Sequence, residues 1–133
     1  MSTLKRTATV LAATAATITL TFTNSGSAWA GSDARAWSRP FDGYSDGACD
    51  LQFDDYGEHF YLNDNLKDGA GCYGTVTVDN AYIGDMHNSK GAGTTAEYNY
   101  DFVDGAIVRF EVCVRDDGKV YWRTCSDPVT GRA

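Results

Sequence analysis

Residues that serve as nucleophiles, catalytic bases or metal ligands are scarce in this chain. Histidine occurs only twice, at His59 and His87. One serine, Ser45, lies in a G-x-S-x-G sequence at 43–47, but residues 31–48 show neither the strand nor the helix pattern that flanks the nucleophile of the α/β-hydrolases. No two cysteines are as close as those of a C-x-x-C pair, which structural zinc sites commonly contain. The missing strand and helix around Ser45 argue against a serine hydrolase, and the wide cysteine spacing argues against a zinc protein.

Long apolar segments are absent after residue 30, but the first thirty residues have a recognisable pattern. Two basic residues precede the apolar, threonine-rich run 8–22, and small residues occupy Ala28 and Ala30. This layout is typical of a secretory signal peptide, cleaved between Ala30 and Gly31. The alternative is a membrane anchor, but the run is too short to span a hydrocarbon core of about 30 Å comfortably. The sequence therefore predicts a secreted, extracellular protein with no membrane attachment after cleavage.

Basic residues are also few. Residues 31–133 contain 9 lysines and arginines against 18 aspartates and glutamates, a net charge of −9. Proteins that bind nucleic acid draw much of their affinity from Lys and Arg at the phosphates. We therefore expect no nucleic-acid partner, and we attribute the acidic stretch from Asp42 to Asp68 to solubility outside the cell.

Four cysteines, at Cys49, Cys72, Cys113 and Cys125, follow the predicted cleavage site. An even number of cysteines in a small exported chain indicates disulfide bonds, because the compartment is oxidising. Three pairings are open, and we favour 49 with 72 and 113 with 125 because neighbours in sequence close small loops. Both bonds would be structural, which leaves no thiolate for catalysis.

From Cys49 onward, apolar residues recur at every second position, as in a strand with one buried face. The predicted strands are 49–55, 58–63, 73–78, 81–87, 94–103, 106–115 and 119–125. Short strands separated by Asp-Gly and other glycine-containing turns indicate an all-β fold, a small antiparallel β-sandwich or a small barrel. We favour the sandwich, with about seven strands and two disulfides.

The chain divides into three predicted parts. Residues 1–30 are the signal peptide, residues 31–48 form an N-terminal arm without a clear pattern, and residues 49–133 form the β-sandwich domain. One domain is the natural number for about 100 residues.

Two dipeptides predict hairpins. The Asp-Gly pair at 104–105 predicts a hairpin between the strands on either side of it. The Asp-Asn pair at 79–80 predicts a two-residue turn that would place Val76 opposite Ile83, so that apolar residues meet on one face.

The segment CVRDDGKVYWRTC, residues 113–125, is the predicted closing hairpin. If the valines before it face the core, Cys113 faces outward, and a disulfide to Cys125 requires both cysteines on one face. Side chains alternate along a strand. If Cys125 faces outward together with Cys113, then Trp122, three positions before Cys125, faces the core. This pairing also requires a longer or bulged turn, with a positive φ at Gly118. The disulfide would then tie two adjacent strands together.

A small exported nuclease is the strongest enzymatic alternative. It would need a carboxylate, an arginine for the phosphate and a histidine, and the candidates are Glu58 or Glu97, Arg109 or Arg123, and His59 or His87. No motif specifies this set, and the histidines lie on different predicted strands, so they meet only if the fold brings them together. We assign no catalytic residue and favour a protein that is not an enzyme.

The segment NDNLKDG, residues 63–69, contains several oxygen donors of the kind that bind calcium. It lacks the residue order and the distal glutamate of an EF-hand loop. Asx-rich turns use such side chains to bond their own backbone. We therefore expect a turn here, and no metal or other cofactor, with loosely bound calcium as the alternative.

Aromatic residues supply the positive indication of binding. Tyr61, Tyr82 and Tyr121 alternate away from the apolar positions of their strands, and His59 has the phase of Tyr61. Exposed aromatic rings beside carboxylates and amides suit a sugar or a protein partner, because they offer a flat apolar surface with polar tips. The alternative is that these rings cover a second layer of the fold.

The chain resembles a broad set of small exported proteins of actinomycete-type bacteria. The resemblance is carried by the Thr/Ala-rich signal segment, the YGEH-like hairpin at 56–59 and the closing stretch RFEVCVRDDGKVYW at 109–122. It implies export and a β fold and assigns no functional residue. The leading hypothesis is a secreted, non-enzymatic protein that binds an extracellular glycan or protein, and the alternative is a small secreted hydrolase, nuclease first.

Overall fold

The computed structural model describes residues 30–133, so the predicted signal peptide lies almost wholly outside the described residues. Within this range the elements are β1 (Ala34–Trp37), β2 (Cys49–Asp54), β3 (His59–Asp64), β4 (Gly71–Val78), β5 (Ala81–Asn88), β6 (Thr95–Asn99), β7 (Ile107–Asp116), β8 (Lys119–Tyr121), the 3-10 helix η1 (Trp122–Thr124) and β9 (Val129–Arg132).

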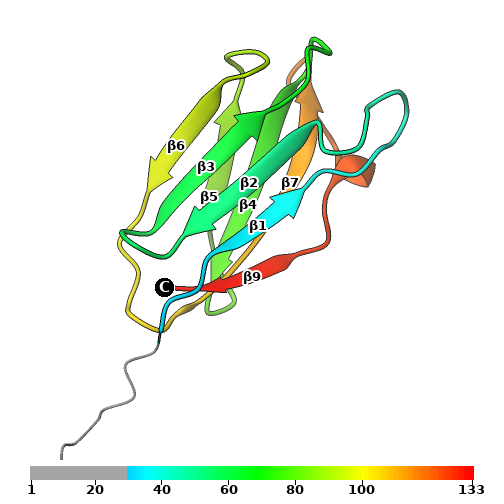
Figure 1. The fold of residues 1–133 in the computed structure, drawn as a ribbon. Coiled ribbons are helices and arrows are strands. Elements are labelled where there is room, and N and C mark those ends of the chain that lie inside the picture. The colour runs from blue at the N-terminus through cyan, green and yellow to red at the C-terminus, as the bar shows by residue number, and fades with distance from the viewer. Residues whose placement is uncertain (1–29) are drawn as a thin grey trace, which may run out of the picture.

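The strands form two antiparallel sheets that pack face to face (Figure 1). Sheet 1 has the order β1-β2-β3-β6, and sheet 2 has the order β5-β4-β7-β8, with β9 also pairing with β7. The predicted all-β sandwich is confirmed, and each predicted strand corresponds to one of the strands β2 to β8.

The core lies between the sheets, where most of the buried apolar side chains gather. Phe53 and Phe60 of sheet 1 meet Phe110 of sheet 2, with the Phe60 ring centroid 4.9 Å from that of Phe53 and 5.4 Å from that of Phe110. All three side chains are almost fully buried. Burial of a side chain of this size contributes about 1.5–3 kcal/mol, so this aromatic cluster is a main source of stability.

The predicted hairpin between β6 and β7 is wrong. A turn does occur at 104–105, where the amide of Ala106 donates to the carbonyl of Val103. However, β6 pairs with β3 in sheet 1, whereas β7 pairs with β4 in sheet 2. Residues 100–106 therefore cross between the sheets. The long strand β7 finds its hydrogen-bonding partner in β4, along the whole length of that strand, and not in the short β6.

The β4–β5 hairpin follows the prediction at its turn and departs from it beyond. Both turn residues have positive φ, 48° at Asp79 and 67° at Asn80, as a type I′ turn requires. Val76 lies opposite Gly84 instead of Ile83, because the register shifts between Val76 and the next residue. The shift leaves Ile83 42% exposed.

The closing hairpin has a tighter turn than predicted. Gly118 has the expected positive φ of 73°, and Asp117 also has a positive φ, of 48°. The turn contains only these two residues, since Val114 pairs with Tyr121, and the prediction of a longer turn is wrong.

Trp122 is not in the core, contrary to prediction. Strand β8 ends at Tyr121, and η1 turns the chain so that Cys125 reaches Cys113 without belonging to the ladder. The premise that the disulfide joins facing residues of a hairpin was therefore incorrect. As a result, Trp122 lies on the surface with 63% of its area exposed.

Both predicted disulfides are present. Cys49–Cys72 joins β2 to β4 and so links the two sheets, whereas Cys113–Cys125 ties η1 to β7 within sheet 2. Cys113 has the predicted outward phase, because it pairs with Tyr73 between the inward-facing Val112 and Val114. Cys113 is nevertheless completely buried, because the segment around Cys125, to which it is bonded, lies over it.

Two strands, β1 and β9, have no counterpart in the prediction. Strand β1 lies in the predicted arm, pairs with β2 along its whole length and has a single well-buried apolar residue, Ala36. In β9, a side chain at Gly131 would place its Cβ 2.7 Å from a ring carbon of Phe53. These strands are held in the sheets by backbone pairing and by close backbone approach to the core. Neither requires apolar residues at alternate positions, so the sequence gives little sign of the strands. No helix among residues 30–133 is long and apolar enough to span a membrane.

Candidate functional site

The outer surface of sheet 2 carries four aromatic side chains, Tyr73, Tyr82, His87 and Trp122, which we call the aromatic face. Tyr73 lies on β4 opposite His87 of β5, and Tyr82 lies further along β5 opposite Thr77. The sequence neighbours of Tyr73 and His87 face the core, so the alternation of the strands turns these rings outward. Trp122 reaches the same surface from η1.

Tyr73 is the centre of this face. Its ring centroid lies 5.2 Å from that of His87 and 5.8 Å from that of Trp122, with the Trp122 ring nearly perpendicular to it. Tyr73 itself is buried, whereas His87, Tyr82 and Trp122 are exposed. Edge-to-face contacts of this kind are favourable and hold rings in defined positions. The exposed indole of Trp122 is therefore supported from below by a buried tyrosine.

Polar side chains surround these rings. The hydroxyl of Tyr82 donates a hydrogen bond to Asp85, and an Arg115 guanidinium nitrogen lies 3.2 Å from Nδ1 of His87. Burial, with additional contributions from Asp85, raises the pKa of the Tyr73 hydroxyl well above its usual range, so this group stays protonated as a hydrogen-bond donor. The aromatic face thus combines apolar rings with donors and acceptors.

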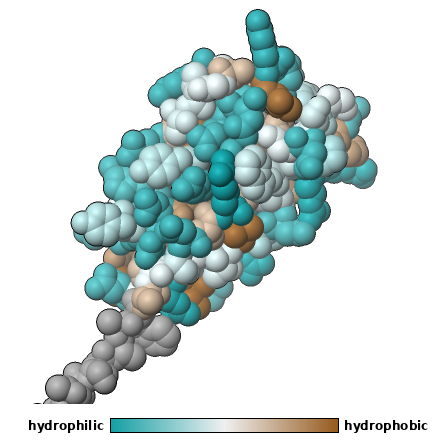
Figure 2. All heavy atoms as spheres, in the orientation of Figure 1, coloured by the Kyte–Doolittle hydropathy of each residue, from teal (hydrophilic) through white to brown (hydrophobic). Residues whose placement is uncertain are grey.

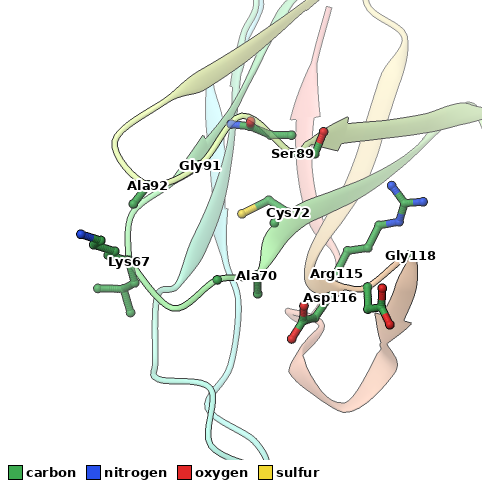
Figure 3. Close-up of a pocket in the computed structure, with 14 residues that line it drawn as sticks. Lys67, Ala70, Cys72, Ser89, Gly91, Ala92, Arg115, Asp116 and Gly118 are labelled. Atoms are coloured by element: carbon green, nitrogen blue, oxygen red, sulfur yellow. The ribbon is translucent and has the colours of Figure 1, made fainter.

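A cleft of about 620 Å³ adjoins the aromatic face at one end of the sandwich (Figure 3). Its walls come from the β3–β4 loop, the β5–β6 loop and the β7–β8 turn, and Cys72 lies between them. Figure 3 shows Lys67 and Ala92 on one side and Arg115 and Asp116 on the other. Many of the remaining lining residues are glycine or alanine, so the cleft is wide and its backbone is accessible.

Internal hydrogen bonds organise the loops around the cleft. The buried Asn88 donates to the carbonyls of Leu62 and Thr94 and accepts from the amide of Lys90, which holds the β5–β6 loop. Asp68 accepts from the amide of Ala70 in the β3–β4 loop. A cleft whose walls are already ordered loses less conformational entropy when a ligand binds.

The four residues predicted to bind a ligand lie in three different places. His59 and Tyr61 stack on the outer surface of sheet 1, with ring centroids 6.0 Å apart. Tyr82 belongs to the aromatic face of sheet 2. Tyr121 lies at the end of β8, where its ring contacts Tyr44 at 5.0 Å. The outer surface of sheet 1 is mainly hydrophilic (Figure 2).

The two histidines do not converge. His59 is on the outer surface of sheet 1 and His87 on that of sheet 2, with the core between them. His59 pairs with Glu97, whose Oε1 lies 2.9 Å from Nδ1. The arginines proposed for a phosphate are elsewhere, since Arg109 is on β7 of sheet 2 and Arg123 lies over the ring of Phe41. Within residues 30–133 the predicted nuclease set is therefore not assembled.

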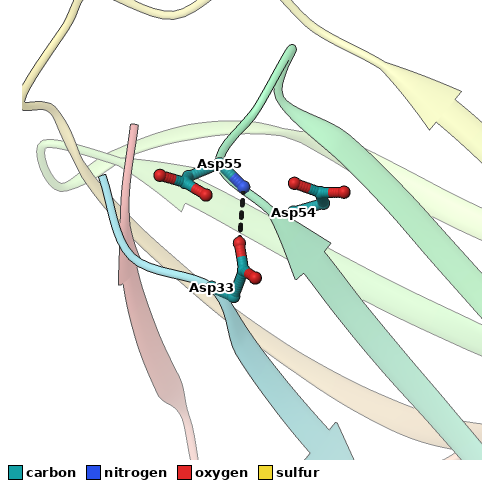
Figure 4. Close-up of side chains that lie close together, drawn as sticks. All are labelled: Asp33, Asp54 and Asp55. Atoms are coloured by element: carbon teal, nitrogen blue, oxygen red, sulfur yellow. Dashed lines mark hydrogen bonds between the residues drawn. The ribbon is translucent and has the colours of Figure 1, made fainter. Parts of the chain in front are cut away.

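Three carboxylates on the edge of sheet 1, Asp33, Asp54 and Asp55, lie within 4.8 Å of one another and are, among residues 30–133, the group best placed to hold a metal ion (Figure 4). The backbone amide of Asp55 donates to Asp33 at 2.9 Å and lowers the pKa of Asp33. Hydrogen bonding to Asp33 in turn raises the pKa of Asp55. Exposed acidic groups commonly lie close together without an ion, and the backbone amide of Asp55 already donates to Asp33, so we assign no metal here.

The segment predicted as a turn or a calcium site, residues 63–69, uses its side chains in several directions. Asn65 donates to Asp50 and to the carbonyl of Gly47, and Asp68 accepts from the backbone amide of Ala70. Asp64 is 3% exposed, and among the described residues its Oδ2 has no hydrogen-bond partner. Burial raises the pKa of Asp64 above its ordinary value. Asp68 thus bonds its local backbone, as expected of an Asx-rich turn, whereas Asn65 ties the segment to residues 47–50.

Replacement of Asp64 by asparagine is expected to stabilise the protein at pH 7. The folded state binds the Asp64 proton more tightly than the unfolded state, so stability falls as the pH rises from about 4 through the raised folded pKa. An asparagine at this position has no charge to bury. Because a buried charge costs more than a buried neutral amide of the same shape, Asp64→Asn should raise the free energy of unfolding by about 1 kcal/mol at pH 7 and by almost nothing at pH 3. Urea denaturation at both pH values measures the difference.

Calcium provides the control for this experiment. If Asp64 binds calcium, the ion should raise the melting temperature of the wild-type protein and abolish the advantage of Asp64→Asn. An unchanged melting temperature in calcium would exclude the calcium alternative. Equal stabilisation of the variant at pH 3 and pH 7 would contradict the assignment to the Asp64 charge.

Comparisons with protein-family models, with curated proteins and with solved structures yield no match to this chain. The candidate site is therefore argued from its geometry alone. Sequence reasoning identified Tyr82 but missed Trp122, Tyr73 and the cleft. The Asp117-Gly118 pair could have revealed the position of Trp122, because this pair favours a two-residue turn. With such a turn, Cys113 and Cys125 cannot face each other in the hairpin, and the reason for placing Trp122 in the core disappears.

Proposed function

We propose that this protein is a secreted, non-enzymatic protein that binds extracellular glycans through the aromatic face of sheet 2. The observation that carries the proposal is Trp122, 63% exposed and set edge-on against the buried ring of Tyr73. A sugar ring has apolar C–H faces that can lie on an indole and hydroxyls that need donors and acceptors. The aromatic rings supply the apolar surface, and Asp85, Arg115 and His87 supply the hydrogen-bond donors and acceptors.

A glycan fits this surface better than a protein partner does. A stable protein interface buries about 800 Å² on each side and is anchored by several apolar side chains at its centre. The aromatic face has two large exposed side chains, Trp122 and Tyr82, and charged side chains contact its rings at Tyr82 and His87. Such a mixture is suited to a small, hydroxyl-rich ligand.

The proposal of export depends on the signal pattern and on the two disulfides. Gly31, the first residue after the predicted cleavage site, lies close to Asp55, because a Cβ at this position would lie 1.8 Å from Oδ2 of Asp55. Cleavage before Gly31 would place a new α-ammonium group beside the carboxylates of Asp33, Asp54 and Asp55. The ammonium charge would offset the repulsion within that group.

The test is retention of residues 31–133 on insoluble chitin, cellulose and xylan. Trp122→Ala is expected to weaken binding at least tenfold, because it removes the platform for the sugar ring. Trp37→Ala is the matched control, since Trp37 is also exposed but lies on sheet 1. Trp37 and Trp122 are the two tryptophans after residue 30, so a Trp37→Phe protein reports ligand contact through the fluorescence of Trp122.

Three results would contradict the proposal. They are no retention on any of the three polysaccharides, equal retention of the wild type and Trp122→Ala, or a loss of binding caused by Trp37→Ala alone. The last result would place the site on sheet 1.

A second candidate function is a small hydrolase centred on His59 and Glu97, favoured by the 2.9 Å contact between them. Hydrolysis of RNA or of the three polysaccharides that is lost with His59→Ala and kept with His87→Ala would support it. No hydrolysis by the wild-type protein would exclude it.

A further inference from the structure

The cleft and the aromatic face are joined by one residue, Arg115. Arg115 lines the cleft, and its guanidinium lies 3.2 Å from the His87 ring. In the ladder, Arg115 pairs with Gly71, two residues along β4 from Tyr73. At about 3.3 Å per residue, the Arg115–Gly71 pair and the Tyr73–Cys113 pair lie about 7 Å apart along the strands, a separation comparable to one pyranose unit. A ligand that lies on the aromatic face can therefore reach the cleft with its next unit.

The charges of the cleft favour a neutral, hydroxyl-rich group. Lys67 and Arg115 contribute positive charges from opposite sides, and neither forms an ion pair with a carboxylate within residues 30–133. Asp116 and Asp117 contribute two negative charges. An anion would be repelled by the aspartates and a cation by the basic residues. A hydroxyl can accept from Lys67 or Arg115 and donate to a carboxylate, so it can use both.

The positions of the loops restrict how a chain can occupy the cleft. The β3–β4 loop crosses from sheet 1 to sheet 2, and the β5–β6 loop crosses back, so both stand across the end of the sandwich. Figure 3 shows Lys67 and Ala92, one from each loop, on the side of the cleft opposite Arg115. A chain that passes over Arg115 from the aromatic face meets these loops. The volume of about 620 Å³ is typical of sites for small ligands.

We propose that the cleft binds the terminal sugar of a neutral glycan whose adjacent units lie on the aromatic face. The inference rests on the proposed glycan binding and adds that the protein recognises chain ends. A short oligosaccharide, which is rich in ends, binds through both surfaces. A long polysaccharide, which has few ends, binds mainly through Trp122.

The experiment compares chitohexaose, cellohexaose and xylohexaose with the insoluble polysaccharides from which they derive. Ala92→Trp fills the cleft from an exposed loop position, and Lys67→Gln removes one hydrogen-bonding charge without adding bulk. Lys90→Gln is the matched control, because Lys90 lies in the β5–β6 loop and is not among the residues that line the cleft. Circular dichroism confirms that each variant is folded, and titration calorimetry measures the affinity.

We expect Ala92→Trp and Lys67→Gln to weaken binding of the recognised hexasaccharide about tenfold or more, with less than a twofold change in retention on its polysaccharide. Trp122→Ala should weaken both. If the cleft variants bind both forms like the wild type and Trp122→Ala binds neither, the cleft inference fails while the proposed function stands. If the cleft variants lose both forms equally, the cleft does not select chain ends, and the inference is also overturned. No binding by the wild-type protein rejects the function and the inference together.

Discussion

Replacing Cys49 and Cys72 together by alanine is expected to lower the free energy of unfolding by about 3–4 kcal/mol. The disulfide closes a loop with a sequence separation of 23 residues, and the chain-entropy model gives a cost of this size for losing it. Both cysteines are buried, and the bond joins β2 of sheet 1 to β4 of sheet 2. Because a domain of this size has a total stability of about 5–15 kcal/mol, the loss is a large share. Urea denaturation of the purified variant measures it.

The second disulfide is the internal control. Cys113–Cys125 closes a loop with a separation of 12 residues, so its removal should cost about 2–3 kcal/mol by the same model. It should also impair the proposed glycan binding, because the disulfide anchors the η1 segment that presents Trp122. Removal of Cys49–Cys72 should leave binding unchanged at temperatures where the protein is folded. The reverse pattern, with binding lost only when Cys49–Cys72 is removed, would contradict this division of roles.

Much of the fold could be predicted because each strand carries its own signal. Val108, Phe110, Val112 and Val114 occupy alternate positions of β7, and all are buried. This alternation is local, so it is visible in a single sequence and survives any arrangement of the strands. The disulfide pairing followed for a similar reason, because the nearest cysteines in sequence were also the nearest in space.

Pairing between strands depends on partners that lie far apart in sequence. A tight turn at 104–105 is compatible with a hairpin, but it equally allows the chain to cross to the other sheet, as it does. Strand β9 pairs with β7 near the C-terminus and packs Gly131 against Phe53. A glycine that permits close approach carries no periodic signal. Both features follow from the assembled sandwich.

The candidate site was harder to predict than the fold, because it combines separate elements. Alternation correctly turned Tyr61 and Tyr82 outward, but it could not tell that they belong to different sheets. The site needs β4 for Tyr73, β5 for His87 and η1 for Trp122, and the cleft needs three loops. Surface residues of this kind become neighbours only after the strand order is known.

Phe60→Ala is expected to destabilise the protein by about 3–5 kcal/mol, the usual range for removing a buried phenylalanine. Phe60 is fully buried on β3 and contacts Phe53 in its own sheet, Phe110 in the opposite sheet and Tyr100 at the crossover between them. The cavity would therefore open where the two sheets meet. For a domain of about 100 residues, each kcal/mol lowers the melting temperature by about 4–8 °C. Calorimetry or urea denaturation of the oxidised protein measures the change.

Tyr61→Ala is the matched control, because Tyr61 is the next residue of the same strand and faces the opposite way. It should cost no more than about 1 kcal/mol, since it removes a partly exposed ring that stacks on His59. Neither variant should change the affinity for glycans while it is folded, because both residues belong to sheet 1 and the aromatic face belongs to sheet 2. A cost for Tyr61→Ala equal to that for Phe60→Ala would show that both faces of β3 are buried. That result would mean that an additional layer covers sheet 1 in solution.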